Sequence, residues 1–307
     1  MNTKELRVRS TKVIWRVISR IYIYVLLIGL SFVFLYPFLY MLVTSIKSYQ
    51  DIINPSVMWI PQELSFSNWK LAFKLMNVER TFFNSLLVTT LCTIAHVFVC
   101  ALVAYGFARF EFRGKNLLFM IVILSILLPV QMLIVPEYII YAELGWIGGY
   151  LPMIVPCFWG YGLRGGLFIF LYRQFFLRFP SSLEEAAYID GCGPVGMFFK
   201  IAFPSAGSSV VVTTVLSIVW HWNDFYEPSI YLQKAKTYLL PMMLPSMYDL
   251  FAEQHGVLSQ TQSALQQTFH MGVVMAGTAI ACLPLLIMFL FMQRKFVEGV
   301  ERSGLTE

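Results

Sequence analysis

The chain has 307 residues, of which 58% are hydrophobic and 13% are charged, and its formal net charge is +5. A soluble domain carries about a quarter charged residues, so this composition excludes an ordinary soluble globular protein and indicates an integral membrane protein. The basic residues are scattered along the edges of apolar runs. This scatter lacks the single basic face of a nucleic-acid-binding protein, so no nucleic acid is expected as a partner.

Six apolar segments are long enough to cross a membrane, which takes about 20 mostly apolar residues. Residues 1–20 precede them as a basic N-terminal segment, and the apolar run that follows is too long for a cleavable signal peptide. The predicted spans cover residues 21–44, 85–108, 117–136, 150–172, 207–228 and 271–292. We therefore expect one transmembrane domain over 21–292, followed by a tail at 293–307.

The distribution of Lys and Arg predicts the orientation, because these residues concentrate in cytoplasmic loops. Most of the 22 basic residues lie before span one, between spans two and three, between spans four and five, or after span six. The expected fold is therefore all-α and integral to the membrane, with six transmembrane helices and both termini in the cytoplasm.

Pro and Gly residues gather in the third and fourth predicted spans, from Pro129 to Gly166. Membrane helices tolerate them where neighbouring helices or a water-filled cavity satisfy the freed backbone groups. They predict either a cavity or a moving interface at these spans, or ordinary kinked packing.

The segment 180–204 is a polar break between spans four and five, on the predicted cytoplasmic side. Ser182 followed by Glu185 is a capping-box pattern that predicts a helix start. Gly191 is a natural helix end, and Pro194 can begin a second helix that Pro204 would stop. The sequence therefore predicts a helix–turn–helix hairpin lying roughly parallel to the membrane.

An apolar face on this hairpin needs a cover, because helices this short are marginal in water. Val195, Phe198, Phe199 and Ile201 supply the apolar area. One interpretation seats the hairpin in a groove of another protein. The other places it as an amphipathic helix on the membrane surface.

The hairpin resembles the EAA loop of ABC importer permeases. Its residues are Glu185-Ala186-Ala187-Tyr188-Ile189-Asp190-Gly191, followed by Gly193, Phe198, Ile201 and Pro204. The spacing from Glu185 to Pro204 matches the family pattern, and Cys192 stands where the family usually has Ala.

The resemblance covers nearly the whole chain. Within the family, the chain is most similar to the carbohydrate-uptake branch and, within that branch, to the maltose-type second permease subunit. The further segments that carry it are YPFLYMLVTSIKS (36–48), FFNSLLVTT (82–90), AYGFARFEFRGK (104–115), LPVQMLIVPEY (128–138), AELGWIGGY (142–150), RQFFLRFPSSLEEAAYIDG (173–191), WHWNDFYEP (220–228) and QRKFVEGV (293–300).

The resemblance implies a multi-pass permease of the bacterial cell (inner) membrane that forms half of a pore for a sugar or oligosaccharide. Its implied partners are a second, related permease subunit in a heterodimer, two cytoplasmic ABC ATPase subunits, an extracytoplasmic solute-binding protein and membrane lipid. The hairpin would then be a coupling helix in a cleft of the ATPase. The residues carried over to that role are Glu185, Ala186, Ala187, Asp190, Gly191, Phe198, Ile201 and Pro204.

No catalytic motif is expected if the ATPase is a separate chain. The sequence contains no GxxxxGK[ST] phosphate loop, no GxSxG and no HExxH. The four histidines lie far apart in the sequence, and the five cysteines have no CxxC spacing. We therefore expect no enzyme activity, no cofactor and no metal in this chain.

Polar and aromatic residues within the spans are candidates for the translocation path. Arg164 either lines the path or binds carbonyls freed by the neighbouring glycines. Trp222, Asn223 and Phe225 either contact a sugar, since rings stack on sugar faces and amides bind hydroxyls, or pack at a helix interface. His96 reads as a packing residue, and Glu137 as a solvated one.

Two predicted external loops, 45–84 and 229–270, are longer than a connection needs. Loops of this size usually bind something, so we expect them to receive the solute-binding protein.

Other classes of function make different demands on the sequence. An ion-driven secondary transporter would place carboxylates mid-span and often shows internal repeats. A membrane-embedded transferase would gather acid, base or metal-binding residues at one interface. The sequence shows neither pattern, so the alternative kept open is an ABC importer permease for a non-sugar solute.

Overall fold

The computed structural model describes residues 3–254 and 269–304. Within these ranges all named elements are helices, apart from one isolated bridge between Lys47 and Leu64. Part of the second predicted external loop, 255–268, lies outside the described residues, as do the last three residues of the tail. The described chain divides into two compact units, with boundaries at Ala72 and Ala279.

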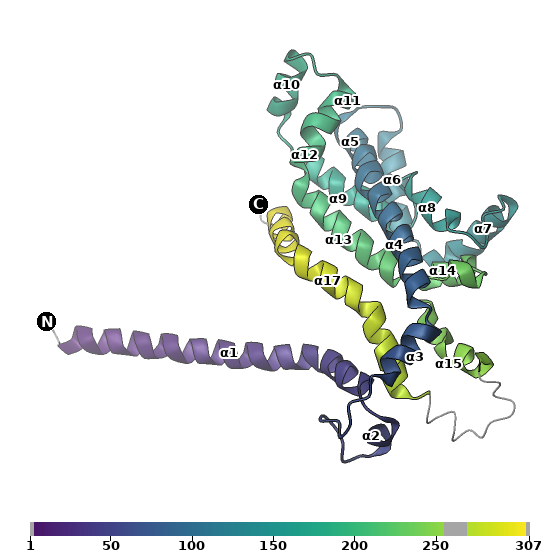
Figure 1. The fold of residues 1–307 in the computed structure, drawn as a ribbon. Coiled ribbons are helices and arrows are strands. Elements are labelled where there is room, and N and C mark those ends of the chain that lie inside the picture. The colour runs from purple at the N-terminus through teal and green to yellow at the C-terminus, as the bar shows by residue number, and fades with distance from the viewer. Residues whose placement is uncertain (1–2, 255–268, 305–307) are drawn as a thin grey trace. The chain divides into compact units, whose positions relative to one another are not determined.

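The first unit contains α1 (Thr3–Ser45), α2 (Tyr49–Ile53), most of α3 (Ser67–Leu75) and the first turns of α17 (Met271–Gly304). Helix α1 is the long purple helix of Figure 1. Its apolar side chains are exposed on all sides from Trp15 to Phe34. Since such a surface is not stable in water, α1 needs lipid or another protein around it.

A buried cation holds together the loop that follows α1. Lys47 is 5% exposed, and its ammonium donates to the carbonyls of Val57 and Met58 at 2.9 and 2.7 Å. Asn68 adds bonds from its amide to the carbonyls of Ser45 and Lys47. Backbone carbonyls thus take the place of a carboxylate partner, as burial of a charged group requires.

The second unit contains the remaining helices and the rest of α17. They are α4 (Val78–Ala95), η1 (His96–Cys100), α5 (Ala101–Arg109), α6 (Lys115–Leu127), α7 (Val130–Glu143), α8 (Leu151–Cys157), α9 (Gly165–Arg178), α10 (Ser181–Ile189), α11 (Pro194–Met197), η2 (Phe198–Ala202), α12 (Phe203–Ser205), α13 (Gly207–Asn223), α14 (Tyr226–Tyr231), η3 (Ala235–Thr237) and α15 (Met243–Gln254).

Three of the described helices are long and apolar enough to cross a membrane, and two bent helix pairs raise the number to as many as five. The single helices are Trp15–Ser45, Val78–Arg109 and Met271–Glu298. The pair α6–α7 bends by 106°. The helix Pro194–Ser205, which comprises α11, η2 and α12, bends by 77° against α13. The all-helical membrane fold is therefore confirmed at this level.

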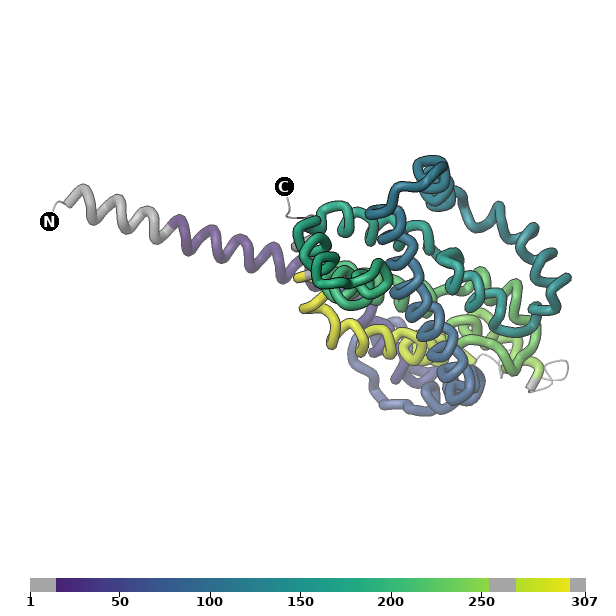
Figure 2. The backbone as a smooth tube through the Cα atoms, turned by 90° about the horizontal axis from the view of Figure 1, so that it is seen from above, coloured from purple at the N-terminus to yellow at the C-terminus, as the bar shows by residue number. Residues whose placement is uncertain are grey.

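The third and fourth predicted spans are not continuous helices. The third turns sharply at Leu128–Pro129, which Figure 2 shows in the teal part of the tube. The fourth, predicted over 150–172, is split into α8 and α9 by seven residues. Gly160 and Gly162 in this break have φ of 71° and 80°. This left-handed backbone ends a helix at little cost only for glycine.

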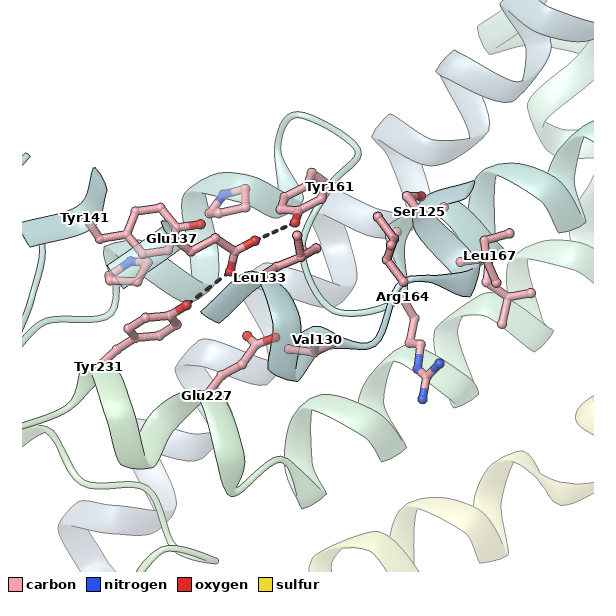
Figure 3. A pocket seen from close by; sticks show the side chains of 17 residues that line it. Ser125, Val130, Leu133, Glu137, Tyr141, Tyr161, Arg164, Leu167, Glu227 and Tyr231 are labelled. Carbon is pink, nitrogen blue, oxygen red and sulfur yellow. Dashed lines mark hydrogen bonds between the residues drawn. The ribbon is translucent and has the colours of Figure 1, made fainter. Parts of the chain in front are cut away.

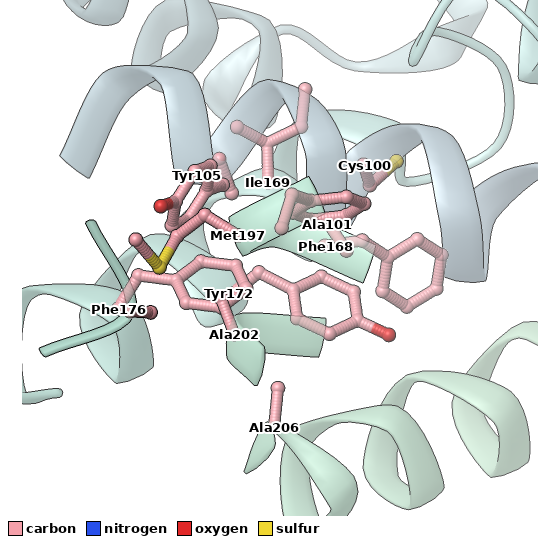
Figure 4. Packing of buried hydrophobic residues seen from close by; sticks show 13 residues of the cluster. Cys100, Ala101, Tyr105, Phe168, Ile169, Tyr172, Phe176, Met197, Ala202 and Ala206 are labelled. Carbon is pink, nitrogen blue, oxygen red and sulfur yellow. The ribbon is translucent and has the colours of Figure 1, made fainter. Parts of the chain in front are cut away.

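The core of the second unit lies between α5, α9 and η2. The large rings of Phe168, Tyr172 and Phe176 on α9 are fully buried. They lie against small residues of α5, including Ala101 (Figure 4). Small side chains on one helix let the backbone of the other approach closely, which is the usual way membrane helices pack.

Candidate functional site

The hairpin predicted from 180–204 is formed by α10 and α11, and it lies at one end of the second unit (Figure 1). Helix α10 ends in a Schellman motif: the N–H of Cys192 donates to the carbonyl of Ala187 at 2.9 Å, and the N–H of Gly191 to that of Tyr188 at 3.0 Å. Gly191 has a φ of 81°, as the motif requires. The predicted helix end at Gly191 and the helix start at Pro194 are both confirmed.

Two details of the predicted hairpin are wrong. Helix α10 begins at Ser181 after Pro180, and no side chain caps it, so the Ser182–Glu185 capping box does not form. Pro180 has an extended backbone at the N-cap, so the helix begins two residues earlier than a cap at Ser182 would place it. The second limb also continues past Pro204 to Ser205. The wide π-turn of η2 precedes Pro204, and such a turn accommodates the missing N–H.

The predicted coupling residues divide into an exposed set and a buried set. Four of them face solvent near the tip: Glu185, Ala186, Asp190 and Gly191. Ala187 and Phe198 are 7% and 2% exposed and belong to the core of Figure 4. Ile201 is half-buried and Pro204 is exposed. Ala187 and Phe198 therefore pack within this chain. The sequence analysis had assigned them, together with the exposed residues, to the contact with the ATPase.

Large apolar side chains surround the exposed set. Tyr188, Ile189, Val195 and Phe199 are 74%, 84%, 71% and 52% exposed. With the carboxylates of Glu185 and Asp190, they form a mixed apolar and acidic surface. We call these six residues the hairpin tip.

A polar pocket lies between α7, α8, α9 and α14, where the prolines and glycines of the predicted third and fourth spans gather (Figure 3). The carboxylate of Glu137 accepts hydrogen bonds from the hydroxyls of Tyr161 and Tyr231, the second at 3.1 Å. Glu137 is half-buried and is bound by these two protein groups, so it is less solvated than the sequence suggested. A pocket here agrees with the cavity that the prolines and glycines suggested.

Glu227 lines the same pocket on α14, beyond the candidate span that ends at Asn223. Burial, helped by the nearby carboxylates of Asp224 and Glu137, raises the pKa of Glu227 to about 8. Sequence reasoning missed Glu227, although its place two residues after the Trp-Asn motif WHWNDF was a usable signal.

Arg164 also borders this pocket, at the start of α9, with a φ of 65°. Its guanidinium lies 5.6 Å from the ring centroid of Trp220. Among the described residues no ion pair joins it to Glu137 or Glu227. Arg164 is therefore at the break of the fourth predicted span, rather than in the middle of a helix.

The other three predicted path residues differ in burial. Trp222 is 4% exposed, its indole N–H donates to the carbonyl of Ala281 at 3.0 Å, and its ring lies 5.9 Å from that of Phe82. Trp222 therefore has the packing role that the sequence left open. Asn223 and Phe225 are exposed at the end of α13.

Two histidines that are distant in the sequence meet in the core. His221 Nε2 lies 3.3 Å from His96 Nδ1, and His96 also contacts Ser217 and the carbonyl of Tyr161. Ligand atoms of His221, Cys92 and Cys157 lie within 4.8 Å of one another, a set that is able to bind a soft metal ion. Both thiols donate to the carbonyl of Met153, at 3.4 and 3.2 Å. Hydrogen bonds within the protein thus satisfy these side chains.

Comparison with known proteins decides the family. Residues 97–302 match the family described as the binding-protein-dependent transport system inner membrane component. The chain belongs to this family. The resemblance of the hairpin to the EAA loop and the placement in a membrane are thereby confirmed, and a permease component of a transporter is established rather than an enzyme.

Individual relatives agree over most of their length. The chain is 33% identical to a probable ABC transporter permease protein, YurM, of Bacillus subtilis, over 86% of this chain and 81% of that one. It is 26% identical to the arabinooligosaccharides transport system permease protein AraQ of the same organism, over 90% and 92% of the two chains. A crystal structure of a bacterial ABC transporter that imports the acidic polysaccharide alginate has the same fold, with a TM-score of 0.72, 21% identity and coverage of 91% and 96%.

Proposed function

We propose that this permease forms half of the pore of a binding-protein-dependent importer for a sugar or oligosaccharide. The observation that carries the proposal is the hairpin tip, an exposed apolar and acidic surface on a rigidly anchored hairpin. Relatives are named as transport system permeases for arabinooligosaccharides and lactose and as a probable one for starch degradation products, which supports a carbohydrate substrate.

The tip would seat in a cleft of a separate ATPase subunit. Glu185, Ala186, Asp190 and Gly191 would contact that subunit, together with the exposed rings and aliphatic side chains beside them. Ala187, Phe198, Ile201 and Pro204 would act from behind by fixing the hairpin on the permease. A small residue at Ala186 permits close approach, and apolar neighbours supply buried area.

The complete assembly would contain this chain, a second and related permease, two ATPase subunits and an external solute-binding protein. Six spans with both termini in the cytoplasm remain our interpretation of the chain, with α6–α7 and α8–α9 as its two broken spans. The fifth span ends at Asn223, five residues before the predicted end at 228. The exposed apolar surface of α1 would be covered by lipid and by the second permease. The long loops around α2, α3 and α15 would receive the binding protein.

The polar pocket is the proposed contact with the carbohydrate. Glu137 and Glu227 offer acceptors to sugar hydroxyls, and Tyr161 and Tyr231 offer hydroxyls and ring faces. Arg164 lies at the edge of this pocket. Asn223 and Phe225 are exposed at the end of α13 and remain candidates for the translocation path.

The test of coupling is purification of the permease with the ATPase that it retains from its own cells. Ile189→Asp and Glu185→Lys should reduce the co-purified ATPase, whereas Phe112→Asp, an exposed apolar residue on another loop, should not. Equal amounts of ATPase in all three variants would refute docking at the tip. Uptake of radiolabelled oligosaccharides by the intact cells, compared with cells lacking the permease, tests the substrate class. If cells with and without the permease take up every oligosaccharide equally, the result would favour a non-sugar solute.

A further inference from the structure

One carboxylate at the base of the hairpin joins α10 to the end of the candidate span Val78–Arg109. Tyr105 and Arg109 lie four residues apart, so they share one face of α5. The hydroxyl of Tyr105 donates to Glu184 Oε1 at 3.2 Å, and Arg109 Nε lies 3.1 Å from the same oxygen. The side chains of Arg109 and Glu184 are only 17% and 18% exposed.

Arg109 also binds Phe179, which lies just before the hairpin. Its Nη2 donates to the carbonyl of Phe179, and its guanidinium lies 5.7 Å from the ring centroid of that residue. The guanidinium therefore fixes both the start of the first limb, through Phe179, and its first turn, through Glu184.

The second limb of the hairpin is held at the same point of α5. The ring of Tyr105 lies 5.4 Å from that of Phe198 on η2 and 5.3 Å from that of Phe176 on α9. Tyr105 is 5% exposed, and Figure 4 shows Met197 of the second limb beside it. One tyrosine thus contacts α10 through its hydroxyl and η2 through its ring.

We infer that Arg109, Tyr105 and Glu184 form a clamp that makes the hairpin and the helix Val78–Arg109 move as one body. The inference rests on the proposed coupling function and adds the path by which motion of the hairpin enters the membrane domain. All three are positioning residues, because they hold the tip and do not belong to it.

Because the ion pair of the clamp is partly buried, it is harder to break than an exposed ion pair. A surface ion pair contributes little, since water and salt screen it. A shielded pair is costly to break from one side, because the remaining charge is left without a partner. Helix α10 has nine residues and α11 has four. Helices this short have little stability of their own, so their position depends on such anchors.

The other end of the helix Val78–Arg109 is also bound to the protein. A displacement of the clamp would therefore be passed along the helix to the residues bound there. The amide of Asn84 donates to the carbonyls of Lys236 and Tyr238, both at 3.0 Å. Ser85 accepts the N–H of Leu240 at 2.8 Å. A shift of the hairpin would therefore reach the segment from Lys236 to Leu240 through one helix.

The experiment uses the purified complex of permease and ATPase in lipid nanodiscs. The reporter is Phe83→Cys, at an exposed position next to Asn84, in a background with Cys192→Ser and Cys282→Ser, which removes the two partly accessible cysteines. The rate of labelling by a maleimide is measured with and without ATP and vanadate. The wild-type clamp should give two different rates.

Arg109→Gln should retain the co-purified ATPase while the two labelling rates become equal, and Arg109→Lys should keep part of the difference because it keeps the charge. The matched control is Lys115→Gln. Lys115, the first residue of α6, pairs with Glu111 of the preceding loop at 2.8 Å, and the side chains of Lys115 and Glu111 are 13% and 89% exposed. Within the described part of the chain this pair does not bind the hairpin, so both rates should stay as in the wild type.

Three outcomes would overturn the clamp. Arg109→Gln keeping the full difference would show that the ion pair transmits nothing. Loss of ATPase from Arg109→Gln would show that the pair builds the docking surface instead. An equal effect of Lys115→Gln would show a general response to charge. If the wild-type permease itself retains no ATPase, the coupling function fails, which is a separate result.

Discussion

Trp222 and Ala281 join α13 to α17 through one hydrogen bond from the indole N–H to a backbone carbonyl, at 3.0 Å. The donor is buried, so removing it leaves the carbonyl without this partner. Trp222→Phe should therefore lower the free energy of unfolding by about 1 kcal/mol. It should leave substrate uptake per folded molecule unchanged, because the ring is a packing element.

Thermal unfolding of the detergent-solubilised protein measures the first effect, and uptake by cells measures the second. Trp159→Phe is the control, since Trp159 is 80% exposed. Loss of uptake by a stable Trp222→Phe protein would return Trp222 to the translocation path.

Gly191 has a φ of 81° and no atom within 4 Å of the place where a Cβ would stand. Any cost of Gly191→Ala is therefore conformational, about 1 kcal/mol for a left-handed residue. The Schellman motif should loosen, and less ATPase should co-purify. Gly193→Ala is matched, because Gly193 is in the same hairpin, has an ordinary φ of −73° and is equally open. If the two variants retain the same amount of ATPase, the left-handed turn is not what orders the tip.

The pKa of Glu227 is raised to about 8 from the ordinary value of 4.5, mainly by burial. The folded protein therefore binds the proton more tightly than the unfolded chain does. The stability from this proton is complete below pH 4.5 and is lost as the pH rises through 8. The wild-type melting temperature should fall between pH 6 and pH 9 by more than that of Glu227→Gln, which cannot ionise. Glu253→Gln, at an exposed position, should follow the wild type. Parallel curves for wild type and Glu227→Gln would mean that Glu227 is solvated.

Gly166 lies where α9 approaches α6. A Cβ there would be 2.5 Å from Ser125 Oγ and 3.1 Å from the carbonyl of Val122. Gly166→Ala should therefore destabilise the protein by about 1–3 kcal/mol through overpacking. Adding Ser125→Ala should recover part of the loss, because it removes the nearer atom. Gly106→Ala on α5 meets nothing within 4 Å and should cause no loss. A melting temperature unchanged by Gly166→Ala would show that the two helices are able to separate there.

The position of the hairpin and its turn could be predicted because they depend on local backbone chemistry. Gly191 ends one helix and Pro194 begins the next, and few other residue types serve these two positions as well. The capping box failed because Pro180, two residues earlier, had a stronger local effect on the helix start than the Ser182 side chain. The spans Val78–Arg109 and Met271–Glu298 were visible as long apolar runs. The breaks at Pro129 and at Gly160–Gly162 were not located, since a run of apolar residues carries no information about the direction of the backbone.

The sequence by itself determined what kind of molecule this is: apolar runs dictate a membrane protein, and the hairpin resembles the EAA loop of the permease family to which the chain belongs. Tertiary structure decided which residues face which partner. Ala187 and Ala186 are identical in type and adjacent, yet Ala187 lies in the core and Ala186 is exposed. Glu137 and Glu227 line one pocket although 90 residues separate them, and Arg109 meets Glu184 across 75. Such pairs arise from helix packing, which brings distant positions together, and no local pattern in the chain records them.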